Sequence, residues 1–325
     1  MKMYGKIIKT DQERLPRMST FFIALTNVLV TLFYLVPGYV VRKMHKVDEH
    51  HLPTLSAILV YIGTPFLEIS MFLTLDFDPA FLLDMGIFFL ITMFTQASFM
   101  ALVFLFSKDK QNARTRILVI SSTMGNVGFF GLPIARALLP DIPELPCYIA
   151  MYMLSMNLLA FTIGVFAVTG DKKYISVRSL FLNPTTFGFL FAFPCFLFGL
   201  KNYLPVPLIN AISAIGNLTT PLCMFILGIR LASAPLKNLF SSPRVFLAPL
   251  LKLVAYPLFA FGIASLFPVS DSIRAVLLVV SSVPCASVIL SLSEMYEGDS
   301  AFSANCLLTS TLLCFVTIPV LVLLL

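Results

Sequence analysis

The feature that most constrains this chain is a series of long apolar runs that carry almost no charge. A helix needs about 20 apolar residues to span the hydrocarbon of a bilayer. Hydrophobic residues make up 58% of the 325 and charged residues 12%, far from the balance of soluble domains. The runs fall near 20–41, 54–74, 80–106, 116–139, 147–169, 185–200, 206–231, 244–267, 273–293 and 301–325. We therefore expect an all-α, multi-pass cell-membrane protein with ten transmembrane helices in the lipid bilayer and no soluble domain.

Lys and Arg concentrate in alternate loops between these runs. Lys201 and Arg274 lie in the other set of loops, whereas 13 basic residues lie in four loops at 42–46, 108–116, 172–178 and 230–244. The positive-inside rule makes these four loops cytoplasmic and places both termini outside. The basic tail at 1–18 disagrees with this orientation, so either the loops dominate or translation starts at Met18. Because the net charge of +6 is spread over loops, nucleic acid is not an expected partner.

The second half of the sequence repeats the first in outline. Residues 114–122 (RTRILVISS) match 274–282 (RAVLLVVSS) at an offset of 160, and further pairs keep offsets near 155: Thr64-Pro65 with Thr220-Pro221, Pro37 with Pro194, and 157–161 with 311–315. Because each half has five segments, the second enters the membrane from the opposite side, as in many alternating-access carriers. We expect a polar tail (1–18), a first repeat (19–170), a cytoplasmic linker (171–184) and a second, inverted repeat (185–325).

Segments four and nine contain helix-breaking residues at matched positions. The fourth reads SSTMGNVGFFGLP at 121–133 and the ninth reads SSVPCAS at 281–287. Broken helices in both halves predict a midplane site, where half-helix N-termini and the Asn126 amide favour an anion. Small residues that only let helices pack closely are the alternative. The predicted substrate site comprises Thr64, Gly125, Asn126, Gly128, Gly131, Pro133, Asn157, Pro284, Cys285 and Ser287.

Two ionisable residues fall inside apolar runs, Glu68 in the second and Lys252 in the eighth. Intramembrane ionisable groups are candidates for ion coupling, although snorkelling or a structural pair would also explain them. The histidines of 43–51 (KMHKVDEHH) match no metal-ligand pattern, so we expect a solvated loop and no metal. Catalytic motifs are also missing, so we expect neither an enzyme nor a cofactor.

At these motifs the sequence resembles the auxin efflux carrier family, in the compact bacterial form related to the plant PIN-type carriers. Residues 125–133 (GNVGFFGLP) resemble the family's segment-four signature. Supporting likeness comes from 183–187 (NPTTF) at the start of the sixth helix, and from 293–299 (SEMYEGD) with Thr317-Ile318-Pro319 near the C-terminal end. The long hydrophilic loop of many plant carriers is absent between segments five and six.

The resemblance implies ten helices in two inverted five-helix repeats, with the fourth and ninth broken and crossing at the site. It implies organic anions as substrates, either malonate- or malate-like dicarboxylates or the monocarboxylate indole-3-acetate. It also implies that Asn126 and the backbone of 128–133 contact the anion and that Pro284 marks the second crossing. Ser287 is then the remaining side-chain donor after Pro284.

We therefore expect a secondary transporter of a small organic anion that works by alternating access. A proton, a sodium ion or the membrane potential could drive it, and a homodimer is an open possibility. The alternatives are a membrane ligand sensor that uses the same fold without net transport, and a channel, although no rings of pore-lining charge are apparent.

Overall fold

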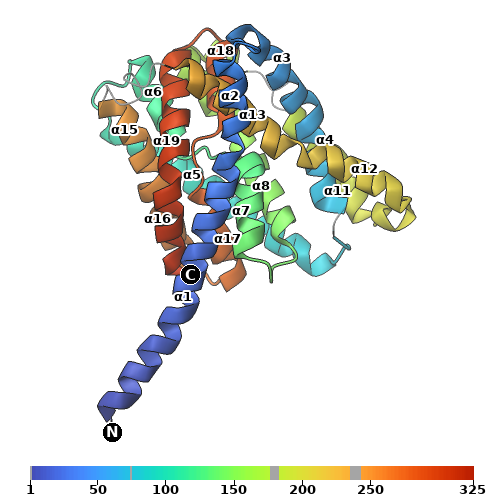
Figure 1. Ribbon diagram of the computed structural model, residues 1–325, viewed down its shortest axis with the longest axis vertical. Coiled ribbons are helices and arrows are strands. Elements are labelled where there is room, and N and C mark those ends of the chain that lie inside the picture. Colours follow the sequence, from blue (N-terminus) through green and yellow to red (C-terminus); the bar gives the residue numbers. More distant parts are fainter. Residues whose placement is uncertain (1, 74, 176–182, 235–242) are drawn as a thin grey trace.

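The structure, a computed structural model, describes the backbone of residues 2–73, 75–175, 183–234 and 243–325, and side chains from residue 18 onward apart from Lys172. Regular structure in these ranges is entirely helical, apart from an isolated antiparallel bridge between Gly125 and Cys285. The predicted all-α class is confirmed. Figure 1 shows the helices gathered into one body, from which the first part of α1 (Lys2–Phe33) projects.

Seven stretches of the described residues are long and apolar enough to cross a membrane. Their elements are α1 with α2 (Leu35–Lys43); η1 (Glu49–His51), α3 (Leu52–Ala57), η2 (Ile58–Gly63) and α4 (Thr64–Leu73); α5 (Pro79–Phe106); α8 (Leu145–Leu159), η4 (Ala160–Gly164) and α9 (Val165–Thr169); α12 (Val206–Asn217) and α13 (Thr219–Ser233); α15 (Pro243–Leu250), η7 (Leu251–Ala255) and α16 (Tyr256–Ser265); and α19 (Ser300–Leu321) with η8 (Val322–Leu324).

The other three predicted runs differ from continuous spanning helices. Run 116–139 is divided into α6 (Ala113–Ser121), η3 (Val127–Gly131) and α7 (Leu132–Leu138), and run 273–293 into α17 (Asp271–Ser281) and α18 (Ser287–Met295). Run 185–200 forms α11 (Pro184–Leu197), whose 14 residues are fewer than the about 20 that a span needs. Length and composition thus support seven of the ten expected crossings.

Two short 3₁₀ helices, η5 (Lys172–Tyr174) and η6 (Leu200–Tyr203), lie in connections. The predicted linker 171–184 begins with η5, but its residues 176–182 lie outside the described part of the chain, as do the basic residues Arg178 and Lys237. Residues 2–18 of the predicted tail are part of α1.

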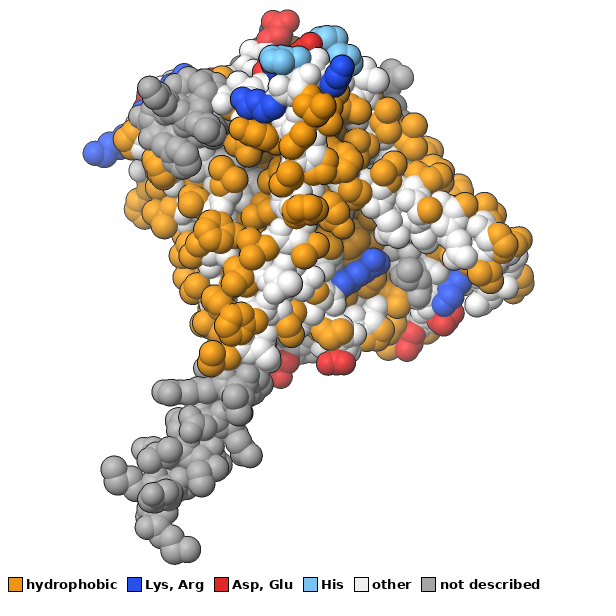
Figure 2. Space-filling view, in the orientation of Figure 1, with side chains coloured by type: hydrophobic (Ala, Val, Ile, Leu, Met, Phe, Trp, Pro, Cys, Tyr) orange, Lys and Arg blue, Asp and Glu red, His pale blue; other side chains and the backbone are white. Residues whose placement is uncertain are grey.

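The outer surface carries a broad apolar belt. Figure 2 shows hydrophobic side chains over most of the visible face, with the histidines at its upper rim and acidic side chains at both its upper and lower rims. Large side chains such as Leu90, Phe106 and Leu266 are more than half exposed. In contrast, α8 is apolar and buried on nearly all sides, as expected of a central helix. Lipid is the solvent that suits this distribution.

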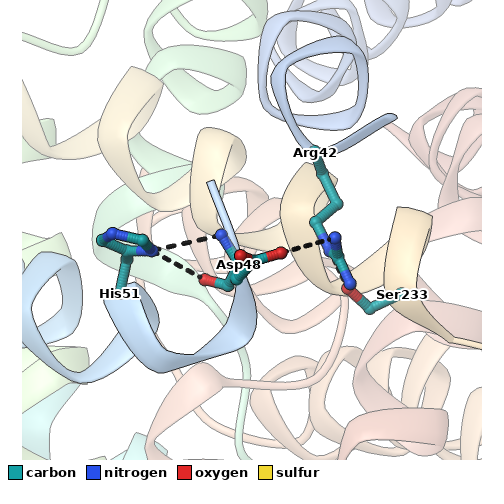
Figure 3. A network of polar contacts seen from close by, with 4 residues as sticks. All are labelled: Arg42, Asp48, His51 and Ser233. Carbon is teal, nitrogen blue, oxygen red and sulfur yellow. Dashed lines mark hydrogen bonds and ion pairs between the residues drawn. The ribbon is translucent and has the colours of Figure 1, made fainter. Parts of the chain in front are cut away.

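Helices α2 and α13 pack with their backbones in close contact. A Cβ added at Gly38 or Gly228 would collide with backbone atoms of the opposite helix. At one end of this pair, Arg42 donates from Nε to Ser233 Oγ and pairs through Nη1 with Asp48 Oδ1, both at 2.8 Å (Figure 3). Arg42 therefore connects α2 both to the end of α13 and to the polar loop that follows α2.

Candidate functional site

Two helix breaks form the centre of the molecule. Helix α6 ends at Ser121 and α17 ends at Ser281, and the backbone becomes helical again at Val127 and Ser287 respectively. The repeated serines have the same role at both breaks: the hydroxyls of Ser122 and Ser282 donate to the carbonyls three residues earlier, at 2.6 and 2.8 Å. These hydroxyls give a second donor to last-turn carbonyls that otherwise accept only from the N–H groups of Ser122 and Ser282, at 3.3 and 3.2 Å.

The broken segments satisfy each other's remaining backbone groups. The Asn126 N–H donates to the Pro284 carbonyl at 2.8 Å, and the Ala286 N–H donates to the Met124 carbonyl at 3.0 Å. This pair of bonds makes the antiparallel bridge between Gly125 and Cys285. Unpaired backbone groups cost several kcal/mol in a membrane interior, so each break stabilises the other. Figure 1 places α6 and α18 toward one end of the body and α7 and α17 toward the other.

A cavity of about 360 Å³ lies against this bridge. Helix α18 lines it along its length, and η3, η2 with the first residue of α4, α8, η4 and the start of α11 also contribute to the wall. The lining residues are Val60, Tyr61, Thr64, Gly125, Asn126, Val127, Gly128, Phe129, Met153, Met156, Asn157, Phe161, Asn183, Pro184, Thr185, Ala286, Ser287, Val288, Ser291, Leu292, Met295 and Tyr296. None of these residues carries a formal charge.

Six of the predicted site residues meet at this cavity, namely Thr64, Gly125, Asn126, Gly128, Asn157 and Ser287. The Asn126 side chain is 4% exposed, and its nitrogen lies 3.7 Å from Cys223 Sγ. The Asn157 amide donates to the Met153 carbonyl of its own helix at 2.7 Å. Residues from the first turns of η3 and α18 also reach the wall, and first-turn N–H groups have no partner within their own helix. The wall is therefore uncharged but electropositive at these two helix ends.

Four other predicted site residues build the crossing but do not line the cavity. Pro284 contributes the carbonyl that accepts from Asn126, and Gly131 lies against Val283 of the ninth segment. The Cys285 N–H donates to Ser310 Oγ at 3.0 Å. Pro133 lies in the first turn of α7, where a missing N–H costs little.

The two candidate coupling residues are both fully buried and lie outside the cavity wall. Glu68 is one turn after Thr64 on α4, and neither carboxyl oxygen has a hydrogen-bond partner among the described residues. Lys252 is on η7 and donates to the carbonyl of Ser281 at 2.5 Å. The structure therefore does not bring these two groups together as an ion pair.

Several lining residues were not identified from the sequence as site residues. Tyr61 and Phe161 belong to η2 and η4, which are π-helical turns, and η3 is a third such turn at the cavity. π-helical turns occur often at functional sites, but no pattern in the sequence predicted these three turns. Asn183 and Thr185 were noted only for the family likeness of 183–187, and that motif was the available signal.

Comparisons with known proteins agree with the membrane-embedded fold. Residues 171–322 match the family model described as membrane transport protein. The chain is 27% identical over 299 residues to an uncharacterized transporter of Methanocaldococcus jannaschii, covering 89% of this chain and 94% of that protein. It is 25% identical over 314 residues to a Rhizobium meliloti protein named "Putative malonate transporter", covering 90% of this chain and 93% of that protein.

The apolar helices and these matches define a multi-pass integral membrane protein of the transporter class. The match over residues 171–322 and the transporter names of these relatives agree with the resemblance to the auxin efflux carriers.

Proposed function

We propose that the chain is a secondary carrier of a small organic anion and that the anion binds in the cavity beside the two helix breaks. The observation that carries this proposal is the junction itself: two interrupted helices bridge each other at Gly125 and Cys285, and the cavity adjoins that bridge. Discontinuous helices at a midplane site are the usual construction of carriers with inverted repeats. The antiparallel bridge supports the predicted inverted arrangement of ten helices in two five-helix repeats.

The chemistry of the cavity favours a carboxylate. Helix N-termini and amide groups stabilise negative charge without the cost of placing a cation in the wall. The volume of about 360 Å³ is in the range of small-molecule sites and leaves room for a di- or monocarboxylate. The name of the Rhizobium meliloti relative supports malonate as the first substrate to test, followed by malate and indole-3-acetate.

The direction in which the cavity extends supports alternating access. It runs along α18 to Met295 and Tyr296 and reaches Asn183 beside the predicted cytoplasmic linker. By the positive-inside rule this end faces the cytoplasm, so the conformation is open inward. Beside this opening, Glu294, which precedes the lining residue Met295 on α18, forms an ion pair of 2.9 Å with Arg230 of α13. Movement of the crossing helices against α2, α4, α11 and α13 would close it and open the opposite side.

Coupling to an ion is assigned to the buried ionisable groups. Glu68 lies one turn from the cavity-lining Thr64, so a proton on its carboxyl would be close to the substrate path. Lys252 is the second candidate. A proton gradient is therefore the first driving force to test, and the membrane potential adds about 2.3 kcal/mol per charge per 100 mV for an anion that leaves the cell.

Uptake by the purified protein in proteoliposomes tests this function. Labelled malonate, malate and indole-3-acetate are offered separately, with and without an imposed proton gradient, and protein-free vesicles are the control. We expect saturable uptake of at least one carboxylate above the control. Specific binding of a carboxylate without flux of any of the three would contradict the carrier and favour a ligand sensor with the same fold.

A further inference from the structure

Lys252 places a fully buried amine beside the cavity, and no carboxylate of the described residues forms an ion pair with it. Its side chain is 0% exposed, and it takes part in none of the ion pairs of the described chain. Nζ donates to the Ser281 carbonyl at the end of α17 and lies 5.3 Å from the centroid of the Tyr256 ring. A carbonyl and an aromatic face stabilise an ammonium but leave its net charge in place.

Gly125 separates this ammonium from the cavity. The glycine lines the cavity, and a Cβ added to it would lie 3.1 Å from Lys252 Nζ, 3.2 Å from its Cε and 2.9 Å from Val283 Cγ2. The lysine side chain thus occupies the space on the far side of Gly125 that any larger residue would need. The ammonium approaches the cavity to within the thickness of one backbone segment without entering the wall.

The field of Lys252 matters because the cavity wall has no formal charge of its own. Charges in a protein interior are screened much less than in water, so a unit charge behind one glycine acts strongly on a ligand in front of it. Its sign is the same as that of the helix N-termini at η3 and α18. All three sources favour an anion and none favours a neutral ligand.

We propose that Lys252 is a specificity-determining residue that makes the cavity select anions by acting through the Gly125 backbone. This inference rests on the proposed function, since it assumes that the cavity is the substrate site. It specifies a ligand with a carboxylate seated next to Gly125. The competing role for Lys252 is structural, as a donor that only caps the carbonyl end of α17.

Lys252→Gln separates these roles, because glutamine keeps a donor for the Ser281 carbonyl but has no charge. Binding of malonate and of its neutral diamide, malonamide, is measured by calorimetry on purified protein, and the ratio of the two Kd values gives the charge selectivity. Lys252→Arg keeps the charge, and Lys108→Met removes an exposed charge elsewhere. We expect Lys252→Gln to reduce the selectivity for malonate by about tenfold or more, and both other variants to keep it within about threefold.

The remaining outcomes are also decisive. Equal weakening of both ligands in Lys252→Gln, or no weakening of either, would overturn the specificity role while leaving the carrier intact. Lys252→Met provides a second uncharged variant. Its ratio of Kd values is measured only on protein that elutes from size-exclusion chromatography as a single species, so that misfolded protein does not affect the result. A wild-type protein that neither binds nor transports malonate, malate or indole-3-acetate would overturn the proposed function, and this inference with it.

Discussion

At the scale of single residues, Glu68 is the group whose environment most requires an explanation. Its carboxyl is fully buried on α4, and both oxygens lack hydrogen-bond partners among the described residues. An ionised carboxylate in such a place would be very unfavourable, so we infer that the group is protonated in this conformation. Helix α11 packs against α4 at this point, and its Gly188 leaves the space that the Glu68 side chain fills. Opening of this contact would be needed to release the proton.

Glu68→Gln tests this interpretation, because the amide resembles the protonated acid. We expect the melting temperature of the purified variant to stay within a few degrees of the wild type, since no charge pair is lost. Carboxylate exchange should persist in proteoliposomes, but net uptake should no longer respond to an imposed proton gradient. Glu49→Gln, at an exposed carboxyl of η1, is the matched control. A retained gradient response in Glu68→Gln would exclude this residue as the coupling site.

The sequence identified part of the cavity at this scale. Asn126, Ser287 and the segment-four glycines were recognisable because helix breakers are rare inside apolar runs and therefore mark a function. Tyr61 and Met153 are ordinary residues of apolar helices, and only the fold shows that they face the cavity. Pro284 and Cys285 lie in the predicted break, but whether a break residue faces the ligand or the opposite break depends on the backbone path.

At the scale of elements, apolar runs predicted where helices occur but not how they deviate from the α-form. The structure contains π-helical turns at η2, η3, η4 and η7, which were not expected. The turns η2, η3 and η4 widen helices near the cavity, and η7 carries Lys252. A π turn depends on the packing of neighbouring helices, so hydropathy alone could not reveal it. The close approach of α2 and α13 is a second feature that hydropathy does not encode.

Substitution of the glycines between α2 and α13 tests this packing. In Gly38→Ala and Gly228→Ala the new methyl group would meet backbone atoms of the other helix, which cannot move as a side chain can. We expect each variant to lose about 1–3 kcal/mol or more of stability, measured by thermal or denaturant unfolding in detergent. Gly86→Ala on α5 is the control, because its Cβ would have no neighbour within 4 Å. Equal stability of Gly38→Ala and Gly86→Ala would show that the helices are not in close contact.

At the scale of the whole molecule, the membrane class followed directly from composition, because so apolar a chain has no soluble alternative. The inverted arrangement was inferred from weak repeats, and the antiparallel bridge of the two breaks supports it. The cavity itself was beyond the sequence, since α4, α8, η3 and α18 come from four separate parts of the chain. Its size and its uncharged wall become visible only when these helices are packed together.

The central claim, that the transported anion binds beside the two breaks, is tested most directly by the concentration dependence of carboxylate uptake by Asn126→Ala in proteoliposomes. A hydrogen bond to a charged ligand contributes about 1.5–3 kcal/mol, so the predicted KM is about ten- to a hundredfold higher than in the wild type. Asn202→Ala, at an exposed asparagine of η6 outside the cavity, should behave as the wild type does. An unchanged KM in Asn126→Ala would place the anion elsewhere and contradict the claim.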